Sequence, residues 1–197
     1  MTIGLPLVEH YRARFAEHGD AALATQMSRA GQAFRFEKLF EIADLDGASV
    51  LDVGCGLGDM YPALRTRYPA ARYQGIDVVP EMVAHAAAKY PEVAFRCHNL
   101  LETTLPERFD YVLMSVVFNN AMAESTAFLQ LLVERAWAVA GRGLAFNFLS
   151  THVNFAEASM AYHDPVAILD FSLRRLSRRV RLEHHYERCD VAVFVYR

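Results

Sequence analysis

Cysteine is scarce in this chain of 197 residues, and its scarcity argues against two common ways of stabilising a fold. Only Cys55, Cys97 and Cys189 occur. They are odd in number, far apart and without a C-x-x-C spacing, so neither a disulfide framework nor a zinc site is expected. We therefore predict no metal site and a reducing, cytoplasmic location.

Long apolar runs and an excess of positive charge are also missing. No stretch of about 18 apolar residues is present to cross a membrane. The N-terminal stretch MTIGLPLVEHYRARF lacks the basic segment and apolar run of a secretory signal. The formal net charge is −3, whereas nucleic acids are bound by clustered Lys and Arg that neutralise phosphates. We therefore expect neither a membrane nor a nucleic acid as a partner.

What the chain does contain is typical of one globular domain. Hydrophobic residues make up 53% and charged residues 22%, and a chain of this length can bury a core without cross-links. No internal repeat or low-complexity linker divides it. We expect a single domain over residues 1–197, with a helical cap over 1–47 and an α/β core over 48–197.

Short apolar runs alternate with helical patterns through the core. Strands are predicted at 49–53, 71–77, 93–97, 109–115 and 143–148, and helices at 58–67, 80–89 and 124–140. Such alternation predicts a parallel sheet with helices on both faces. Two final strands, 178–184 and 191–196, follow each other so closely that they must be antiparallel. The predicted fold is a Rossmann-like, doubly wound α/β fold: a mostly parallel seven-stranded sheet with an antiparallel C-terminal strand pair and an N-terminal helical cap.

Apolar stripes at helical spacing predict which helix faces are buried. In the cap, a first helix presents Val8, Tyr11 and Phe15, and a second, over 32–43, presents Phe36, Leu39, Phe40 and Ala43. The predicted inner face of helix 124–140 holds Phe128, Leu131, Leu132 and Val139. A last helix opens with Asp164 as N-cap and Pro165 in its first turn, and its stripe is Val166, Leu169, Leu173 and Leu176.

A glycine-rich stretch follows the first predicted strand and opens a helix. It runs from Asp52 to Gly58 as D-V-G-C-G-L-G. Glycines let the backbone turn sharply and approach a ligand, and the helix start offers free N–H groups. A dinucleotide fingerprint would need a third glycine at position 59, which is Asp59, a poor neighbour for a pyrophosphate. The loop therefore suits a ligand without phosphates that carries an amino group and a sulfonium charge.

This stretch resembles the first motif of class I S-adenosylmethionine-dependent methyltransferases, and the downstream spacing agrees. Asp77 ends the second predicted strand, where the family has an acid that accepts both ribose hydroxyls. Asn99 stands where the family usually has an acid that contacts adenine, and its carbonyl could still accept from the adenine amino group. The resemblance implies S-adenosyl-L-methionine as cofactor, with Arg35 of the cap holding its carboxylate. The full predicted cofactor set is Arg35, Asp52, Gly54, Cys55, Gly56, Gly58, Asp77, Val78, Asn99, Leu100 and Ser115.

Polar side chains follow the fourth and fifth predicted strands, at the carboxyl ends where such sheets bind ligands. We predict that His152 is the general base, because a histidine titrates near neutral pH, and that Asn119 orients it. The alternatives are a solvated loop histidine at 152 and a plain turn at Asn119. The segment 115–120 lacks the Asn/Asp-Pro-Pro-Tyr pattern associated with nucleobase methylation.

The sequence therefore predicts a methyltransferase that modifies an oxygen or nitrogen atom of a small-molecule metabolite by in-line transfer, as a monomer or homodimer. A base is needed only if the acceptor is protonated, because the sulfonium carries its own leaving group. Two alternatives stay open: an enzyme that cyclises or cleaves the same cofactor, and a non-catalytic protein that binds it. The glycine loop does not distinguish among the three.

Overall fold

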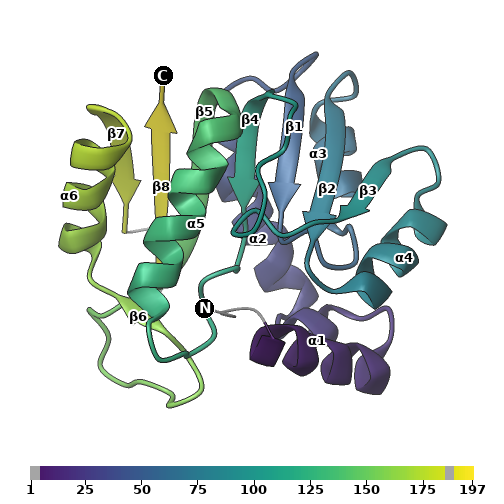
Figure 1. The fold of residues 1–197 in the computed structure, drawn as a ribbon, viewed down its shortest axis with the longest axis horizontal. Coiled ribbons are helices and arrows are strands. Elements are labelled where there is room, and N and C mark those ends of the chain that lie inside the picture. The colour runs from purple at the N-terminus through teal and green to yellow at the C-terminus, as the bar shows by residue number, and fades with distance from the viewer. Residues whose placement is uncertain (1–4, 185–188) are drawn as a thin grey trace. The chain divides into compact units, whose positions relative to one another are not determined.

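The computed structural model describes residues 5–184 and 189–197, which form two compact units. The first ends at Asn99 and the second begins at Leu100, and each contains both strands and helices (Figure 1). Within the described ranges, no helix combines the length and the apolar character that a membrane span requires.

The first unit begins with helices and continues as a parallel sheet. Its elements are α1 (Leu5–His18), the 3-10 helix η1 (Ala22–Thr25), α2 (Arg29–Phe40), β1 (Ser49–Val53), α3 (Met60–Arg67), β2 (Arg72–Asp77), α4 (Pro80–Lys89) and β3 (Ala94–Cys97). β2 lies between β1 and β3 and pairs with both in parallel. A helix joins each strand to the next, as parallel neighbours require.

The start of α2 shows why its apolar pattern alone misplaced its boundaries. The helix begins earlier than predicted because Ser28 caps it, with Oγ accepting from the Gly31 N–H at 3.1 Å. It also ends earlier, at Phe40. Phe36, Leu39 and Phe40 are buried as predicted.

The second unit is built around one long strand, β5. Its elements are β4 (Phe109–Met114), α5 (Ser125–Val139), β5 (Ala140–Ser150), β6 (Tyr162–His163), α6 (Pro165–Arg175), β7 (Arg179–Glu183) and β8 (Asp190–Tyr196). β5 pairs with β4 in parallel and with β8 antiparallel, and β7 pairs antiparallel with β8. The predicted antiparallel final pair is thus confirmed, although residues 185–188 between its strands lie outside the described residues. The two-residue strand β6, which adds to the end of β5, was not predicted.

Helix α6 buries a different face from the one predicted. Val166 and Leu173 are 69% and 42% exposed, whereas Ile168 and Phe171 are buried. Both sets have helical spacing, so periodicity alone could not distinguish them. The buried set includes the large aromatic side chain of Phe171. The start of the helix is as predicted, because Asp164 Oδ1 accepts from the Val166 N–H at 2.8 Å.

Helix α5 shows a smaller difference. Leu131, predicted to lie on its inner face, is 37% exposed. The buried face is broader than predicted and contains Phe128, Leu129, Leu132, Val133, Ala136, Trp137 and Val139.

Candidate functional site

The glycine-rich loop between β1 and α3 has a backbone that only glycine adopts readily. Gly54, Gly56 and Gly58 have φ values of +78°, +53° and +76°, in the region that L side chains disfavour. The Gly54 N–H donates to the carbonyl of Ile76, near the end of β2, at 2.8 Å. The loop is therefore anchored on the strand that also carries Asp77.

Phe95 of β3 fills the space behind this loop. A Cβ added at Gly58 would lie 2.8 Å from Phe95 Cζ, and one at Gly75 would lie 2.7 Å from Phe95 Cδ1. Both distances are too short for carbon atoms, so the ring packs directly on two glycine backbones.

Asp77 ties the loop to the start of α4. Its Oδ2 accepts from the Gly56 N–H and its Oδ1 from the Val79 N–H, both at 2.9 Å. Burial raises the pKa of this carboxyl above its ordinary value, while the backbone donors of Val79 and Gly56 oppose the increase. Each carboxylate oxygen can accept more than one hydrogen bond, so ribose hydroxyls could add to the existing bonds.

Asp52 supports the loop from the core. It is 2% exposed, and Tyr73 donates its hydroxyl to Oδ2 at 2.7 Å. Burial raises the pKa of Asp52 to about 7, although the bond from Tyr73 acts in the opposite direction. Its carboxylate faces Tyr73 in the protein interior. Asp52 was predicted to bind the cofactor, and in this position it supports the loop from behind.

The other predicted cofactor residues have varied surroundings. Cys55 is buried, and burial raises the pKa of its thiol well above the ordinary value. Arg35 is half-buried and donates from Nη1 to the carbonyl of Gly31 in its own helix, at 3.1 Å. Asn99 is half-buried and Leu100 is buried, each beyond the end of β3.

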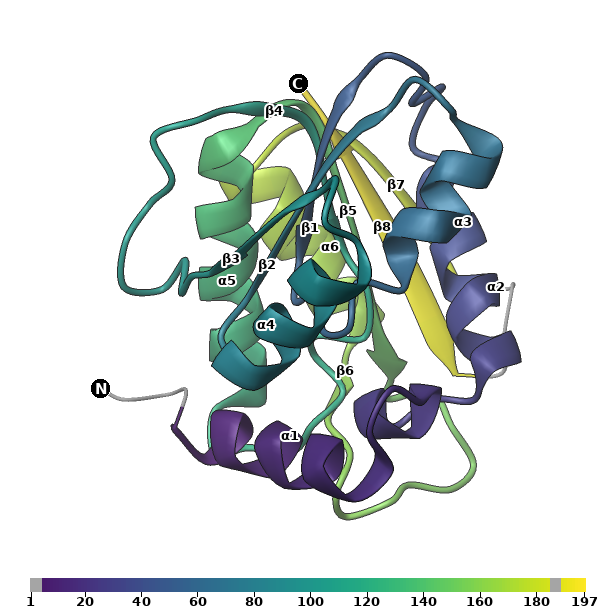
Figure 2. The ribbon, with the colours of Figure 1, turned by 90° about the vertical axis from the view of Figure 1, so that its right-hand side faces the viewer.

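The N-terminal helices pack on the same loop. Ala24 of η1 lies in one buried apolar cluster with Leu57 of the loop, and Thr25 Cγ2 would lie 3.3 Å from a Cβ at Gly56. Arg12 of α1 pairs with Glu81 of α4 at 2.7 Å, where α1 runs below α4 (Figure 2). The remaining members of the cluster and its neighbours are Val79, Met82, Val8, Tyr11, Phe15 and Val78.

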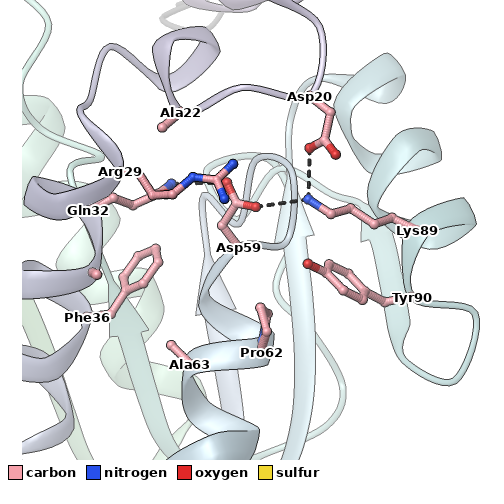
Figure 3. A pocket seen from close by; sticks show the side chains of 11 residues that line it. Asp20, Ala22, Arg29, Gln32, Phe36, Asp59, Pro62, Ala63, Lys89 and Tyr90 are labelled. Atoms are coloured by element: carbon pink, nitrogen blue, oxygen red, sulfur yellow. Dashed lines mark hydrogen bonds and ion pairs between the residues drawn. The ribbon is translucent and has the colours of Figure 1, made fainter.

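A pocket of about 400 Å³ opens beside the loop, lined by residues of α2, α3 and the end of α4 (Figure 3). Lys89 lies at its edge between two carboxylates, with Nζ 2.8 Å from Asp20 Oδ1 and 3.1 Å from Asp59 Oδ1. Burial alone would lower the pKa of Lys89, but the two acids outweigh it and the pKa is raised. None of the predicted cofactor residues lines this pocket, and Asp59 is the link between it and Gly58.

In the second unit, Ser115 and Asn119 lie in the segment that follows β4. Ser115 is half-buried and Asn119 is 6% exposed. The Ser115 Oγ and the Asn119 Oδ1 are both buried, and neither has a hydrogen-bond partner among the described residues. These side chains therefore have bonding capacity that their own unit leaves unused.

His152 lies in the exposed loop after β5. Its backbone N–H donates to Ser150 Oγ at 3.0 Å, and its ring lies edge-on to that of His184 with centroids 6.0 Å apart. In the part of the chain that the structure describes, no hydrogen bond joins His152 to Asn119. Within the same residues, no group of three or more His, Cys, Asp or Glu side chains could hold a metal ion.

The sequence suggested that His163, together with Asp164 and Pro165, belongs to the start of a helix, whereas the structure places His163 in β6. It is 1% exposed, with Nδ1 3.1 Å from Thr126 Oγ1 and Nε2 3.2 Å from the Phe118 carbonyl oxygen. Burial lowers the pKa of this imidazole, although the bond to Phe118 raises it. A neutral ring that donates to Phe118 and accepts from Thr126 satisfies both contacts, so His163 holds the segment containing Asn119.

Comparison with known proteins adds three likenesses. Residues 50–136 match a family described as a methyltransferase domain. A Mycobacterium tuberculosis protein named a methyltransferase is 30% identical over 156 residues, which cover 76% of this chain and 93% of that protein. The malonyl-[acyl-carrier protein] O-methyltransferase of Acetivibrio thermocellus is 32% identical over 117 residues, 57% of this chain but only 39% of that protein.

A solved structure confirms the fold class. The magnesium protoporphyrin IX methyltransferase of Synechocystis, crystallised with bound SAH, superposes with a TM-score of 0.68. The match covers 100% of this chain and 96% of that one at 17% identity, so it shows the fold alone. The expected Rossmann-like α/β architecture, with antiparallel C-terminal strands, is correct.

Proposed function

Because the chain belongs to the class I S-adenosylmethionine-dependent methyltransferase family, whose cofactor is S-adenosyl-L-methionine, we propose that it methylates an oxygen or nitrogen atom of a small-molecule metabolite. The observation that carries the proposal is the loop from Gly54 to Gly58, with three positive φ values and a bond to the Asp77 carboxylate. Backbone N–H groups of this loop lie next to the Asp77 carboxylate, and the loop lacks the third glycine of the dinucleotide-binding fingerprint.

In this proposal the first unit holds most of the cofactor. Asp77 accepts the ribose hydroxyls, Asn99 meets the adenine and Arg35 pairs with the carboxylate of the amino-acid arm. Asp52 keeps the loop in place through Tyr73 rather than by touching the ligand. The remaining contacts are assigned to Gly54, Cys55, Gly56, Gly58, Val78, Leu100 and Ser115.

Methyl transfer requires little of the side chains beyond alignment of the two reactants. Methyl transfer from a sulfonium is an in-line displacement, so the protein must mainly align the acceptor with the methyl group and exclude water. A carboxylate acceptor is already deprotonated at neutral pH, whereas a hydroxyl or an ammonium group must first lose a proton. His152 is the proposed base for that second case.

One sequence relative supports a small acceptor group. The Acetivibrio protein is named for methylation of a malonyl group carried on a protein. We assign Asn119 to the acceptor, because its neutral amide suits a compact acceptor better than a polyanion.

Binding and turnover test the proposal directly. S-adenosylmethionine should raise the melting temperature and NAD should not, with about 2.7 kcal/mol of stabilisation at a hundredfold excess over Kd. Incubation with a panel of small acids, phenols and amines should then yield S-adenosylhomocysteine and a methylated product by mass spectrometry. Cofactor loss without a methylated product would favour cyclisation or cleavage, and binding without turnover would favour a non-catalytic role.

The role of His152 gives a separate prediction. If the acceptor is a hydroxyl or an ammonium group, His152→Ala should lower turnover about 10²–10⁴-fold, the usual contribution of a general base, with cofactor affinity unchanged. His184→Ala, which removes the neighbouring exposed ring, is the matched control. Single-turnover methyl transfer should be followed at several pH values, and identical profiles for wild type and His152→Ala would show that His152 is a loop residue.

A further inference from the structure

Val116, directly after Ser115, has an unusual backbone conformation. Its φ is +64°, in the left-handed region. A β-branched side chain rarely adopts this region because its Cβ substituents crowd the backbone. Such outliers persist only where the surroundings enforce them, and they gather at functional segments.

Asn147 of β5 enforces this conformation. Its Oδ1 accepts from the Val116 N–H at 2.7 Å, across the parallel pairing in which Met114 lies opposite Phe146. Asn147 is 1% exposed. Because Oδ1 is used by Val116, the orientation of the amide is fixed, and Nδ2 is left buried without a partner among the described residues. A buried donor without a partner destabilises the fold, so the bond to Val116 is the evident reason for an amide here.

The rest of the segment is held as firmly. The Phe118 carbonyl oxygen lies 3.2 Å from His163 Nε2, and the Ala161 N–H donates to the Asn119 carbonyl at 2.9 Å. The backbone is therefore fixed at three positions, while the Ser115 Oγ and the Asn119 Oδ1 remain unused. A backbone held at three positions keeps the side chains of Ser115 and Asn119 at a fixed separation, as a preorganised segment requires.

We propose that Asn147 is a positioning residue for methyl transfer. By holding Val116 in the left-handed region, it fixes Ser115, assigned to the cofactor, relative to Asn119, assigned to the acceptor. This inference rests on the proposed function, which supplies those two assignments. Asn147 touches neither ligand, so its effect is on alignment, and small misalignments lower the rate much more than they lower affinity.

The test begins with Asn147→Leu, which removes both the bond to Val116 and the unused donor while keeping the same number of side-chain heavy atoms. We expect turnover of an acceptor from the panel above to fall about 10- to 100-fold, the range that a displacement of about 1 Å produces. Calorimetry with S-adenosylhomocysteine should give a nearly unchanged Kd. Hydrogen exchange of the peptide spanning 115–120 should become clearly faster, because the Val116 N–H loses its acceptor.

A second-site variant separates positioning from general damage. Glycine adopts a positive φ without strain, so Val116→Gly in the Asn147→Leu background should recover much of the lost turnover. Val117→Gly in the same background is the matched control, because Val117 is not in the left-handed region, and it should not restore activity.

The outcomes are distinguishable. Equal turnover, or equal hydrogen exchange, in wild type and Asn147→Leu would overturn the positioning role. Equal recovery by Val116→Gly and Val117→Gly would also overturn it, because the conformation of Val116 would then not matter. If no acceptor is methylated by the wild type, the proposed function fails, while hydrogen exchange still decides whether Asn147 holds Val116.

Discussion

At the scale of single residues, the proposed cofactor site depends mainly on Asp77. Its two carboxylate oxygens are already bonded to the backbone on either side of the site, at Gly56 and Val79. Removing the carboxylate would therefore free the loop as well as delete the proposed ribose contact. A substitution of Asp77 should therefore weaken cofactor binding more than a substitution at a residue that only holds the loop or only contacts the cofactor.

Asp77→Ala should weaken binding of S-adenosylhomocysteine at least about tenfold, because each unsatisfied buried partner costs about 1–3 kcal/mol. Calorimetry measures this, with Asp44→Ala, an exposed acid of the same unit, as control. Affinity in the wild type should also fall as the pH drops through the raised pKa of Asp77, since the protonated form is a weaker acceptor. Wild-type affinity in Asp77→Ala would remove the site assignment.

At the scale of elements, Lys89 joins three parts of the first unit. It lies at the end of α4 and bonds both to Asp20, in the turn after α1, and to Asp59, at the start of α3 (Figure 3). Since Asp59 follows the glycine loop, this cluster couples the N-terminal segment to the loop by charge as well as by apolar packing.

Lys89→Met should therefore loosen the N-terminal segment. We expect faster proteolysis between residues 19 and 28. The free energy of unfolding should fall by only about 1 kcal/mol, because solvent screens partly exposed ion pairs. Added salt should narrow the difference from wild type. Lys38→Met removes a pair with Glu41 at the end of a single helix and serves as control. Equal cleavage rates for Lys89→Met and wild type would contradict the coupling.

The elements also show what the sequence could and could not predict. The order of strands and helices followed from apolar periodicity, and the loop from its three glycines. The buried face of α6 did not, because Leu173 and Phe171 both belong to helical stripes and only tertiary packing selects between them. Asn147 was missed although a signal existed: it is the single polar residue in the apolar run Leu144–Leu149. Its partner, the backbone of Val116, has no sequence signature.

At the scale of the whole molecule, two buried groups make stability depend on pH in opposite directions. The pKa of Asp52 is raised to about 7, so its contribution is present at low pH and is lost as the pH rises through about 7. The pKa of His163 is lowered, so its contribution is lost as the pH falls below the ordinary histidine value of about 6.5. The two effects partly cancel, so the free energy of unfolding of the wild type should vary less with pH than either group alone would cause.

Asp52→Asn isolates the first effect. The amide can still accept from Tyr73 but does not ionise, so the variant should gain stability relative to wild type between pH 5 and pH 8. Of the increase from 3.8 to about 7, about two pKa units lie above pH 5, which corresponds to an upper bound of about 3 kcal/mol. Urea unfolding at both pH values measures the difference, and Asp44→Asn should show none. A constant difference across the range would mean that Asp52 does not titrate there.

The packing of Phe95 against two glycines has a consequence for evolution. Gly75 has an ordinary φ and lacks only space, because a Cβ there would meet both the Phe95 ring and, at 2.9 Å, the Sγ of Cys55. A side chain at 75 therefore needs smaller residues at both 95 and 55. Gly58 lacks space too, but its φ of +76° would remain unfavourable for a side chain after the ring had shrunk. Among homologues, residue 75 should therefore covary with residues 55 and 95 together, whereas position 58 should stay glycine whatever residue 95 becomes.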